Sequence, residues 1–278
     1  MILWKFVMFI QIITYILLPI MVAYIATVMA KRKEVKIEAQ GQLLEHRIQA
    51  YSKVYRFMSK SMSLIAIPNY QKQLYIDCLE GSEYKIDSQS MKYASFLSHI
   101  ESLEQYYNQL DELVLENGLH LESKLKRELN YFWQWMLSVA QLLKTFKAIE
   151  DDQQYKLPEN VKKNMIRYAC GLIGVALQAD VQQFNKNIMP LLEDKLRYPR
   201  IRKWSFSEDD NSYNPKENSY TQSQLVTHIS DIIIRLMYLH YSFQYPSNQF
   251  DNLPEEKRSR LVNAFFESFI RHYDEYYT

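Results

Sequence analysis

The sequence predicts an all-α protein, in which a single N-terminal transmembrane helix is followed by a cytoplasmic multi-helix bundle with coiled-coil-like packing. Three observations lead to this fold class. An uncharged, mostly apolar run lies near the N-terminus, apolar residues then recur at alternating spacings of four and three, and glycine is scarce, with five among 278 residues. So few glycines argue against a turn-rich β-sandwich, a dinucleotide-binding fold and a phosphate-binding loop.

The first element is an anchor, which we place at residues 1–30. Residues 6–30 carry no charge, and only three of them are plainly polar, namely Gln11, Thr14 and Thr27. A helix over these residues would be roughly 37 Å long at about 1.5 Å per residue. The apolar core of a bilayer is about 30 Å thick, so the length suffices for a tilted crossing.

The orientation of the anchor is predicted by the charges that flank it. The side after the apolar run is strongly positive because of Lys31, Arg32, Lys33 and Lys36, whereas Lys5 is the one basic side chain before it. The positive-inside rule therefore predicts a single-pass membrane protein with its N-terminus outside and its body in the cytoplasm. A cleaved signal peptide ending near Ala26 is the alternative, and it would give a secreted helical protein.

The balanced overall charge hides an uneven distribution. Residues 1–36 hold five Lys or Arg and one Glu, a net charge of +4, while the remainder holds 28 basic and 31 acidic residues, a net charge of −3. A slightly acidic body does not favour binding of nucleic acid. The expected partners are the lipid bilayer and either another protein or a second copy of the chain. The two cysteines form no disulfide framework.

Apolar residues at 4-3 spacing mark the helices of the body. Four series keep this spacing without a break: Leu44 to Ile65, Phe96 to Val114, Leu125 to Phe146 and Leu225 to Phe243. Such spacing puts each series on one side of a helix, and no sustained alternation indicates a strand. We expect a helical bundle over residues 31–204, with helices to residue 66 and near 88–116, 120–150 and 158–189, and a loop with a short helix between 67 and 87. The first series can pack within the bundle or against a second copy.

The C-terminal region begins with a polar linker. Residues 205–221 are rich in Ser, Asn, Asp and Glu and include Pro215. Beyond them, residues 222–278 are expected to form a helical hairpin, with helices at 222–245 and 254–277, that docks on the bundle. Pro158 and Pro254 are both followed by Glu, as at the first turn of a helix.

A search for catalytic and metal-binding motifs finds no established pattern. The sequence contains no Cys-x-x-Cys, no His-Glu-x-x-His and no Gly-x-Ser-x-Gly, so no cofactor or metal is expected. His228 and Asp231 share a helical face, but two ligands do not make a metal site. Cys170, beside Gly171, is interpreted as a close helix contact. The chain leans towards a non-enzymatic function.

One short pattern resembles a known family. The segment Arg235-Leu-Met-Tyr-Leu-His240 is similar to the Arg-x(4–6)-His motif of HEPN domains, which are all-α and often ribonucleolytic. The resemblance implies that Arg235 and His240 flank a phosphodiester, usually across a dimer interface, in a membrane-associated effector of prokaryotic defence. Leu236 departs from the polar residue that commonly follows the arginine. The interpretation favoured here is that Arg235 faces solvent and His240 lies at a helix surface, and the HEPN-like effector is the alternative.

A basic run precedes the polar linker. Five positive residues occur within nine positions, with Tyr198 and Trp204 interleaved: Lys195, Arg197, Arg200, Arg202 and Lys203. The run is interpreted as a solvated connector, with anionic lipid headgroups or nucleic acid as the alternatives. The sequence therefore favours interaction, scaffolding or sensing at a membrane, with tyrosines such as Tyr273, Tyr276 and Tyr277 available for partner binding.

Overall fold

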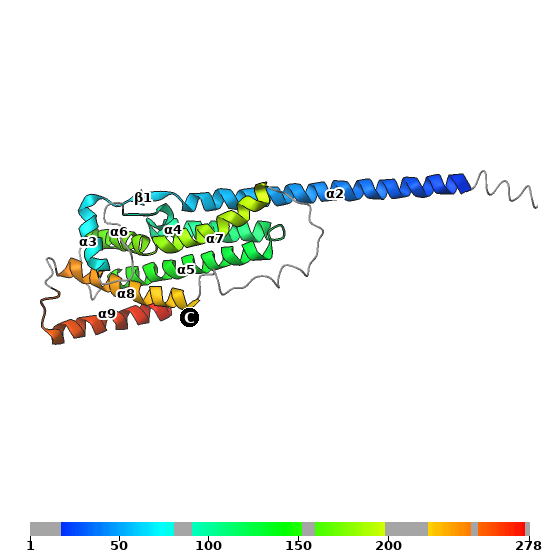
Figure 1. Cartoon of the computed structure of the whole chain (residues 1–278). Helices are drawn as coiled ribbons and strands as arrows, with labels where there is room; N and C mark the ends of the chain where they lie inside the picture. The colour runs from blue at the N-terminus through cyan, green and yellow to red at the C-terminus, as the bar shows by residue number, and fades with distance from the viewer. Residues whose placement is uncertain (1–17, 81–90, 152–158, 198–221, 246–249, 276–278) are drawn as a thin grey trace, which may run out of the picture. The chain divides into compact units, whose positions relative to one another are not determined.

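A computed structural model describes residues 18–80, 91–151, 159–197, 222–245 and 250–275, and the structure there is almost entirely helical (Figure 1). The all-α prediction is therefore confirmed. In chain order the elements are α2 (Leu18–Ser61), β1 (Leu64–Ala66), α3 (Asn69–Leu79), β2 (Lys92–Ala94), the 3-10 turn η2 (Ser95–Leu97), α4 (Ile100–Asn117), α5 (Ser123–Asp151), α6 (Glu159–Ala176), α7 (Gln178–Arg197), α8 (Gln222–Gln244) and α9 (Glu255–Glu275).

The chain divides into two compact units. Among the described residues, one unit comprises residues 18–49, and the other comprises the described residues from 50 to 275. The division falls within α2, which runs without a break from Leu18 to Ser61. The predicted boundary between anchor and bundle at residue 30 therefore does not coincide with a helix end. The unit boundary lies about five helical turns further on.

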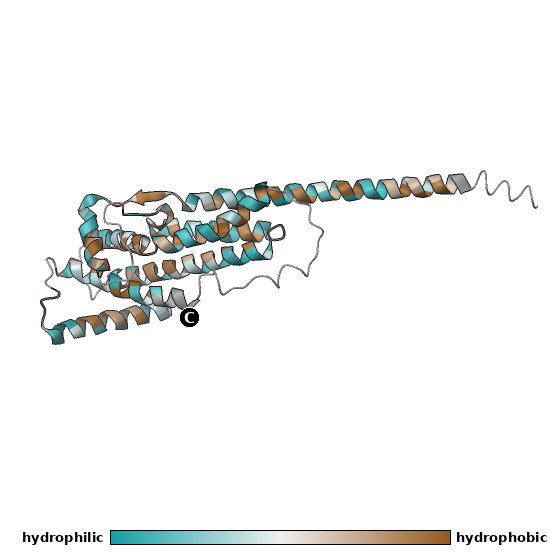
Figure 2. Cartoon of the chain, viewed as in Figure 1, coloured by the Kyte–Doolittle hydropathy of each residue, from teal (hydrophilic) through white to brown (hydrophobic). Residues whose placement is uncertain are grey.

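The larger unit is built around α5. Seven residues of its 4-3 series, from Leu125 to Phe146, are at most 1% exposed. A helix with one fully apolar side buries that side when neighbours cover it, and α4, α6, α7, α8 and α9 all pack against α5 (Figure 1). Trp135 and Phe132 of α5 are both fully buried in this core. Figure 2 shows the apolar residues distributed along the helices of the bundle.

The last turns of α2 belong to this core, but only part of the series that the sequence marks is buried there, and the end of the series lies beyond α2. Tyr51 and Met58 are buried, whereas Met62 and Ile65 are 47% and 37% exposed. The buried side instead includes Val54 and Phe57, and the Phe57 ring stacks on Tyr106 of α4 with ring centroids 4.3 Å apart. Spacing alone does not decide which of two adjacent apolar rows faces the core.

Two short strands are present where only helix and loop were expected. β1 and β2 pair antiparallel, with Ile65 opposite Tyr93, and Ile67 N–H donates to the Met91 carbonyl at 3.0 Å. Strands of three residues are too short to show the period-two alternation by which strands are recognised. The expected helix over residues 88–116 is correspondingly shorter and begins at Ile100.

The expected helix 158–189 is two helices that meet at Leu177, and the second continues beyond its predicted end. α7 passes through Pro190 and ends at Arg197. Proline in a helix interior removes one backbone hydrogen bond. Pro190 is exposed, so water can reach the backbone carbonyl that loses its helical partner.

The two C-terminal helices pack on the rest of the larger unit. α8 lies against α3, α5 and α6, and α9 lies against α5. The Tyr241 hydroxyl of α8 donates to the Leu261 carbonyl of α9 at 2.5 Å. The polar linker 205–221 lies outside the described residues. This packing brings residues from three distant parts of the sequence around Arg235 and His240.

Candidate functional site

The N-terminal turns of α2 expose large apolar side chains. Met21, Val22, Tyr24, Ile25 and Met29 have exposed fractions between 47% and 71%. Five such residues within nine positions leave a concentrated apolar surface on a single helix. Extended apolar surface on a soluble monomer is uncommon and generally marks an interaction site.

The membrane prediction is tested only in part by the described residues. No helix among them combines the length and the apolar character that a bilayer crossing requires. The predicted apolar run begins at residue 6, and its residues 6–17 lie outside the described ranges.

The basic cluster follows the apolar turns on the same helix. Lys31, Arg32, Lys33 and Lys36 all lie within α2 and are all exposed. Val35, within the cluster, and Ile37, directly after it, are also exposed, at 58% and 59%. α2 therefore carries exposed apolar side chains before the basic cluster, within it and directly after it.

Arg235 does not face solvent, which corrects one of the expectations from the sequence. Its guanidinium group is 12% exposed, and its Nη2 atom lies 3.1 Å from Asp231 Oδ1 one turn earlier in α8. Nη1 donates to the Glu80 carbonyl at 2.8 Å, at the end of α3. Arg235 thus satisfies backbone carbonyls that the terminus of α3 leaves without helical partners.

His240 is fully buried rather than at a helix surface. Its Nδ1 atom lies 2.5 Å from Oε1 of Glu150, and both side chains are 0% exposed. Its Nε2 atom lies 2.8 Å from Gln244 Nε2, and the ring of Phe265 has its centroid 5.5 Å away. The imidazole is therefore enclosed by α5, α8 and α9.

The two residues of the HEPN-like motif do not converge on a common cleft. Five residues along an α-helix correspond to a rotation of about 140° beyond a full turn, so the two side chains leave α8 in different directions. Arg235 contacts α3, while His240 contacts α5 and α9. Glu150 is the residue that sequence reasoning missed, because its contact with His240 spans 90 positions of sequence.

The basic run is only partly described. Lys195 lies 2.6 Å from Glu122, and Arg197 lies 3.4 Å from Glu193 one turn earlier. Arg200, Arg202 and Lys203 are outside the described residues, as are Tyr198 and Trp204. The two described cations are paired with acidic neighbours, which fits the connector interpretation better than a free basic surface.

The remaining candidates are structural. His228 Nδ1 lies 3.2 Å from Asp180 Oδ2, whereas Asp231 pairs with Arg235, so the two residues do not share a ligand. Within the described ranges, no cluster of three metal-ligating side chains is present. Cys170 is 1% exposed, and an added Cβ at Gly171 would lie 2.3 Å from the Tyr75 hydroxyl oxygen. The close packing inferred from the sequence is therefore present.

Burial also makes the thiols unsuitable as nucleophiles. Desolvation raises the pKa of Cys78 to about 12 and that of Cys170 to about 12. The reactive form of cysteine is the thiolate, which is scarce so far below the pKa. Burial likewise raises the pKa of the Tyr75 and Tyr106 hydroxyls well above their ordinary value. These groups are protonated packing elements at neutral pH.

The comparisons with known proteins identify no relative. No protein-family model, no curated protein and no solved structure matches this chain.

Proposed function

We propose that this chain is a single-pass, membrane-anchored helical protein whose cytoplasmic bundle acts in protein interaction, scaffolding or sensing, without catalysis. The observation that carries the proposal is the order in which apolar and basic surfaces follow each other along α2. Exposed apolar turns are followed directly by an exposed band of four positive charges. An apolar helical segment that ends in Lys and Arg is the arrangement expected where a helix leaves a bilayer on the cytoplasmic side.

Non-catalytic action is supported by the surroundings of the polar residues. His240 has no exposed surface, and Arg235 is held by a carboxylate and by backbone carbonyls. A ribonuclease would need both groups within reach of a phosphodiester. No observation in the described part of the chain favours the defence-effector alternative over the interaction role.

The tethering proposal is tested with a matched pair of variants on one helix. Val22→Lys/Ile25→Lys places two charges in the apolar turns, and Val35→Lys/Ile37→Lys places two charges at the C-terminal end of the basic band. All four positions are between 47% and 59% exposed, so neither variant disturbs a packed core. A Lys at the centre of a membrane helix costs about 2.5–3.5 kcal/mol on insertion scales and less towards its ends, and Val22 and Ile25 lie in the second half of the predicted run.

The measurement is membrane fractionation of the full chain after a carbonate wash. We expect the wild type and Val35→Lys/Ile37→Lys to remain in the membrane pellet, and Val22→Lys/Ile25→Lys to move largely to the supernatant. Equal fractionation of the two variants would contradict the proposal. The mass of the purified chain provides a second measurement, because loss of the residues before Ala26 would establish the signal-peptide alternative.

Orientation requires a separate variant. Replacing Lys31, Arg32, Lys33 and Lys36 with Gln removes the charge bias that predicts a cytoplasmic body. Protease added to intact cells should digest the bundle of a substantial fraction of this variant, and should spare the bundle of the wild type. Digestion of the wild-type bundle from outside would overturn the proposed orientation.

A further inference from the structure

The small sheet has two outer edges, and they differ in what covers them. Within the described residues the sheet consists of β1 and β2 alone, and β1 lies between the ends of α2 and α3 (Figure 1). On the outer edge of β2, the N–H of Ala94 donates to Oε1 of Gln178 at the start of α7, at 2.9 Å. On the outer edge of β1, the described part of the chain supplies no hydrogen-bond partner.

The hydrogen bonds between the strands show which backbone groups point to that open edge. The Ser95 N–H donates to the Ser63 carbonyl at 2.8 Å, and the Ile67 N–H likewise donates to β2. In an antiparallel pair, residues whose backbone groups bond the neighbouring strand alternate with residues whose groups point away from it. Leu64 and Ala66 belong to the second set. β1 therefore presents two N–H groups and two carbonyls to the outside, in the spacing of a strand.

The side chains around the open edge are apolar and exposed. All three residues of β1 are exposed, with Leu64 at 47% and Ile65 at 37%. Met62 before the strand and Tyr70 after it are 47% and 75% exposed, and Figure 2 shows β1 coloured as apolar. An exposed edge that carries neither charge nor proline readily pairs with another extended chain.

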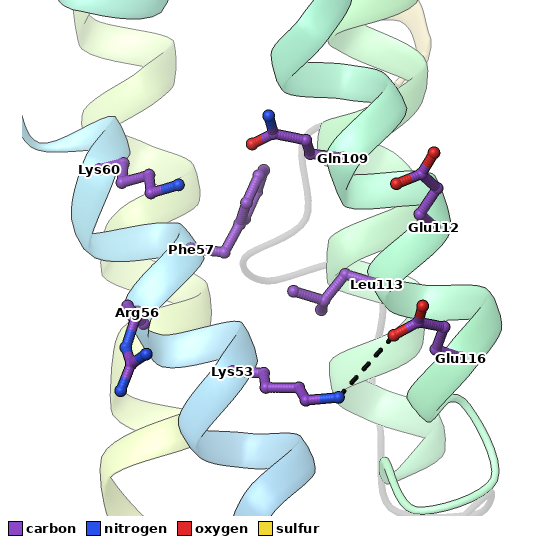
Figure 3. Close-up of a pocket in the computed structure, with 8 residues that line it drawn as sticks. All are labelled: Lys53, Arg56, Phe57, Lys60, Gln109, Glu112, Leu113 and Glu116. Atoms are coloured by element: carbon purple, nitrogen blue, oxygen red, sulfur yellow. Dashed lines mark ion pairs between the residues drawn. The ribbon is translucent and has the colours of Figure 1, made fainter.

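The charges near this edge are all of one sign. Residues 59–76 and 91–100 contain neither Asp nor Glu, and their basic residues are Lys60, Lys72 and Lys92. Figure 3 shows Lys60 in the last turn of α2, at the opposite end of the drawn groove from the Lys53–Glu116 ion pair. Lys60 and Lys92 are both exposed. Within the part of the chain that the structure describes, neither takes part in an ion pair.

We infer that the outer edge of β1 is a docking site for an extended segment of a partner protein, uncharged and apolar or β-branched in its middle and acidic at its ends. The backbone of such a segment would bond the outward groups of Leu64 and Ala66 and add a third strand to the sheet. Its acidic ends would lie in the positive field of Lys60 and Lys92.

Charge also distinguishes this partner from a second copy of the chain. Antiparallel pairing of two β1 strands would place the Leu64 end of one strand beside the Ala66 end of the other. Lys60, which precedes Leu64, would then approach Lys92 of the other copy, because Lys92 pairs with Ala66. Like charges at both ends oppose that pairing, whereas an acidic partner is attracted at both ends.

This inference names the kind of partner in the proposed function and rests on its interaction role alone. Pairing at β1 does not require the membrane anchor. Binding of a peptide can therefore fail while membrane fractionation succeeds, and the reverse.

The test measures binding of labelled peptides to the full chain in mild detergent by fluorescence anisotropy. The probe has alternating Val and Thr residues between terminal pairs of Asp, and it is N-methylated at alternate residues so that one edge is blocked and it cannot pair with itself. We expect it to bind through its open edge. The same peptide N-methylated at every Val and Thr should have a dissociation constant at least about tenfold higher, because it offers no N–H groups to β1. Replacing its terminal Asp with Lys should weaken binding by at least about threefold at low salt.

Variants of β1 test the backbone and the side chains separately. Ala66→Pro removes an outward N–H that β2 does not use, and proline is tolerated in an edge strand at such a position. It should raise the dissociation constant at least about tenfold, whereas Ala66→Val keeps the N–H and should bind like the wild type. Leu64→Ser should weaken binding severalfold. Leu115→Ser is its matched control on α4, where the leucine is 76% exposed, and should have no effect.

Circular dichroism of each variant establishes that the fold is retained. The inference would be overturned if the probe did not bind, if the fully N-methylated peptide bound equally well, or if Ala66→Pro and Ala66→Val behaved alike. Tighter binding of the Lys-ended peptide would overturn the acidic character of the partner. Analytical ultracentrifugation supplies the remaining outcome, because a wild-type dimer that Ala66→Pro dissociates would show that a second copy occupies the edge and would overturn the assignment to a partner protein.

Discussion

The buried contact between His240 and Glu150 leads to a prediction about stability. Both side chains are 0% exposed, and Nδ1 of the imidazole lies 2.5 Å from Oε1 of the carboxylate. His240→Leu removes the group that faces this carboxylate and leaves a carboxyl in the core of α5, α8 and α9. Removing one partner of a buried pair costs about 3–5 kcal/mol, whereas replacing both partners with apolar residues is often nearly neutral.

The expected magnitudes follow from that asymmetry. His240→Leu should lower the free energy of unfolding by about 3–5 kcal/mol, which for a unit of this size corresponds to a melting temperature lower by about 6–20 °C. His240→Leu/Glu150→Met should recover most of this loss, because neither member of the pair is then left in the apolar surroundings without the other. The effects of His240→Leu and of Glu150→Met on the free energy of unfolding should therefore be far from additive.

The assay is urea unfolding of the full chain in mild detergent, followed by far-ultraviolet circular dichroism. His99→Leu is the control, since His99 is exposed and makes no cap hydrogen bond at the start of α4. It should change the unfolding free energy by less than about 0.5 kcal/mol. The reasoning would be refuted by a cost below about 1 kcal/mol for His240→Leu, or by a double variant as unstable as His240→Leu alone.

Two further predictions concern packing and pH. Gly174→Ala should destabilise by about 1–3 kcal/mol although alanine favours helix, because the new Cβ would lie 2.4 Å from Cδ2 of Tyr93. Gly41→Ala meets nothing within 4 Å and should not destabilise, and thermal melts compare the two. Burial raises the pKa of Cys78 and Cys170 from 9.0 to about 12. Above pH 9 the unfolded state therefore binds fewer protons than the folded state, so the free energy of unfolding should fall between about pH 9 and 12. Urea titrations should show a shallower fall for the double Cys→Ala variant, and an equal fall would contradict the assignment.

Much of the fold was predictable from the chain because helices are local structures. The series Leu125 to Phe146 places one residue per turn on a single side of α5, and all of these residues are buried. Where two adjacent rows are both apolar, as in α2 near Tyr51 and Val54, the local pattern is ambiguous and the neighbouring helices decide which row is buried. The three-residue strands and the continuation of α7 through Pro190 also depend on contacts with neighbouring elements and on solvent. The period of the apolar residues does not indicate them.

The contacts of the site residues could not be predicted from the sequence for the same reason. Spacing correctly identified Arg235 and His240 as members of one helix, but their partners lie in α3 and α5, as far as 157 positions away in sequence. Nothing in the sequence near His240 indicates Glu150, because pairs distant along the chain meet only after the helices pack.

By itself, the sequence determined the helical class, the position of most helices and the concentration of apolar residues and positive charge near the N-terminus. These properties depend on residue type and on a period of 3.6, and both can be read from consecutive residues. Only the tertiary structure decided that His240 is enclosed and that Arg235 binds the end of α3. Those outcomes depend on which helix faces come together, and packing free energy summed over the whole chain makes that choice.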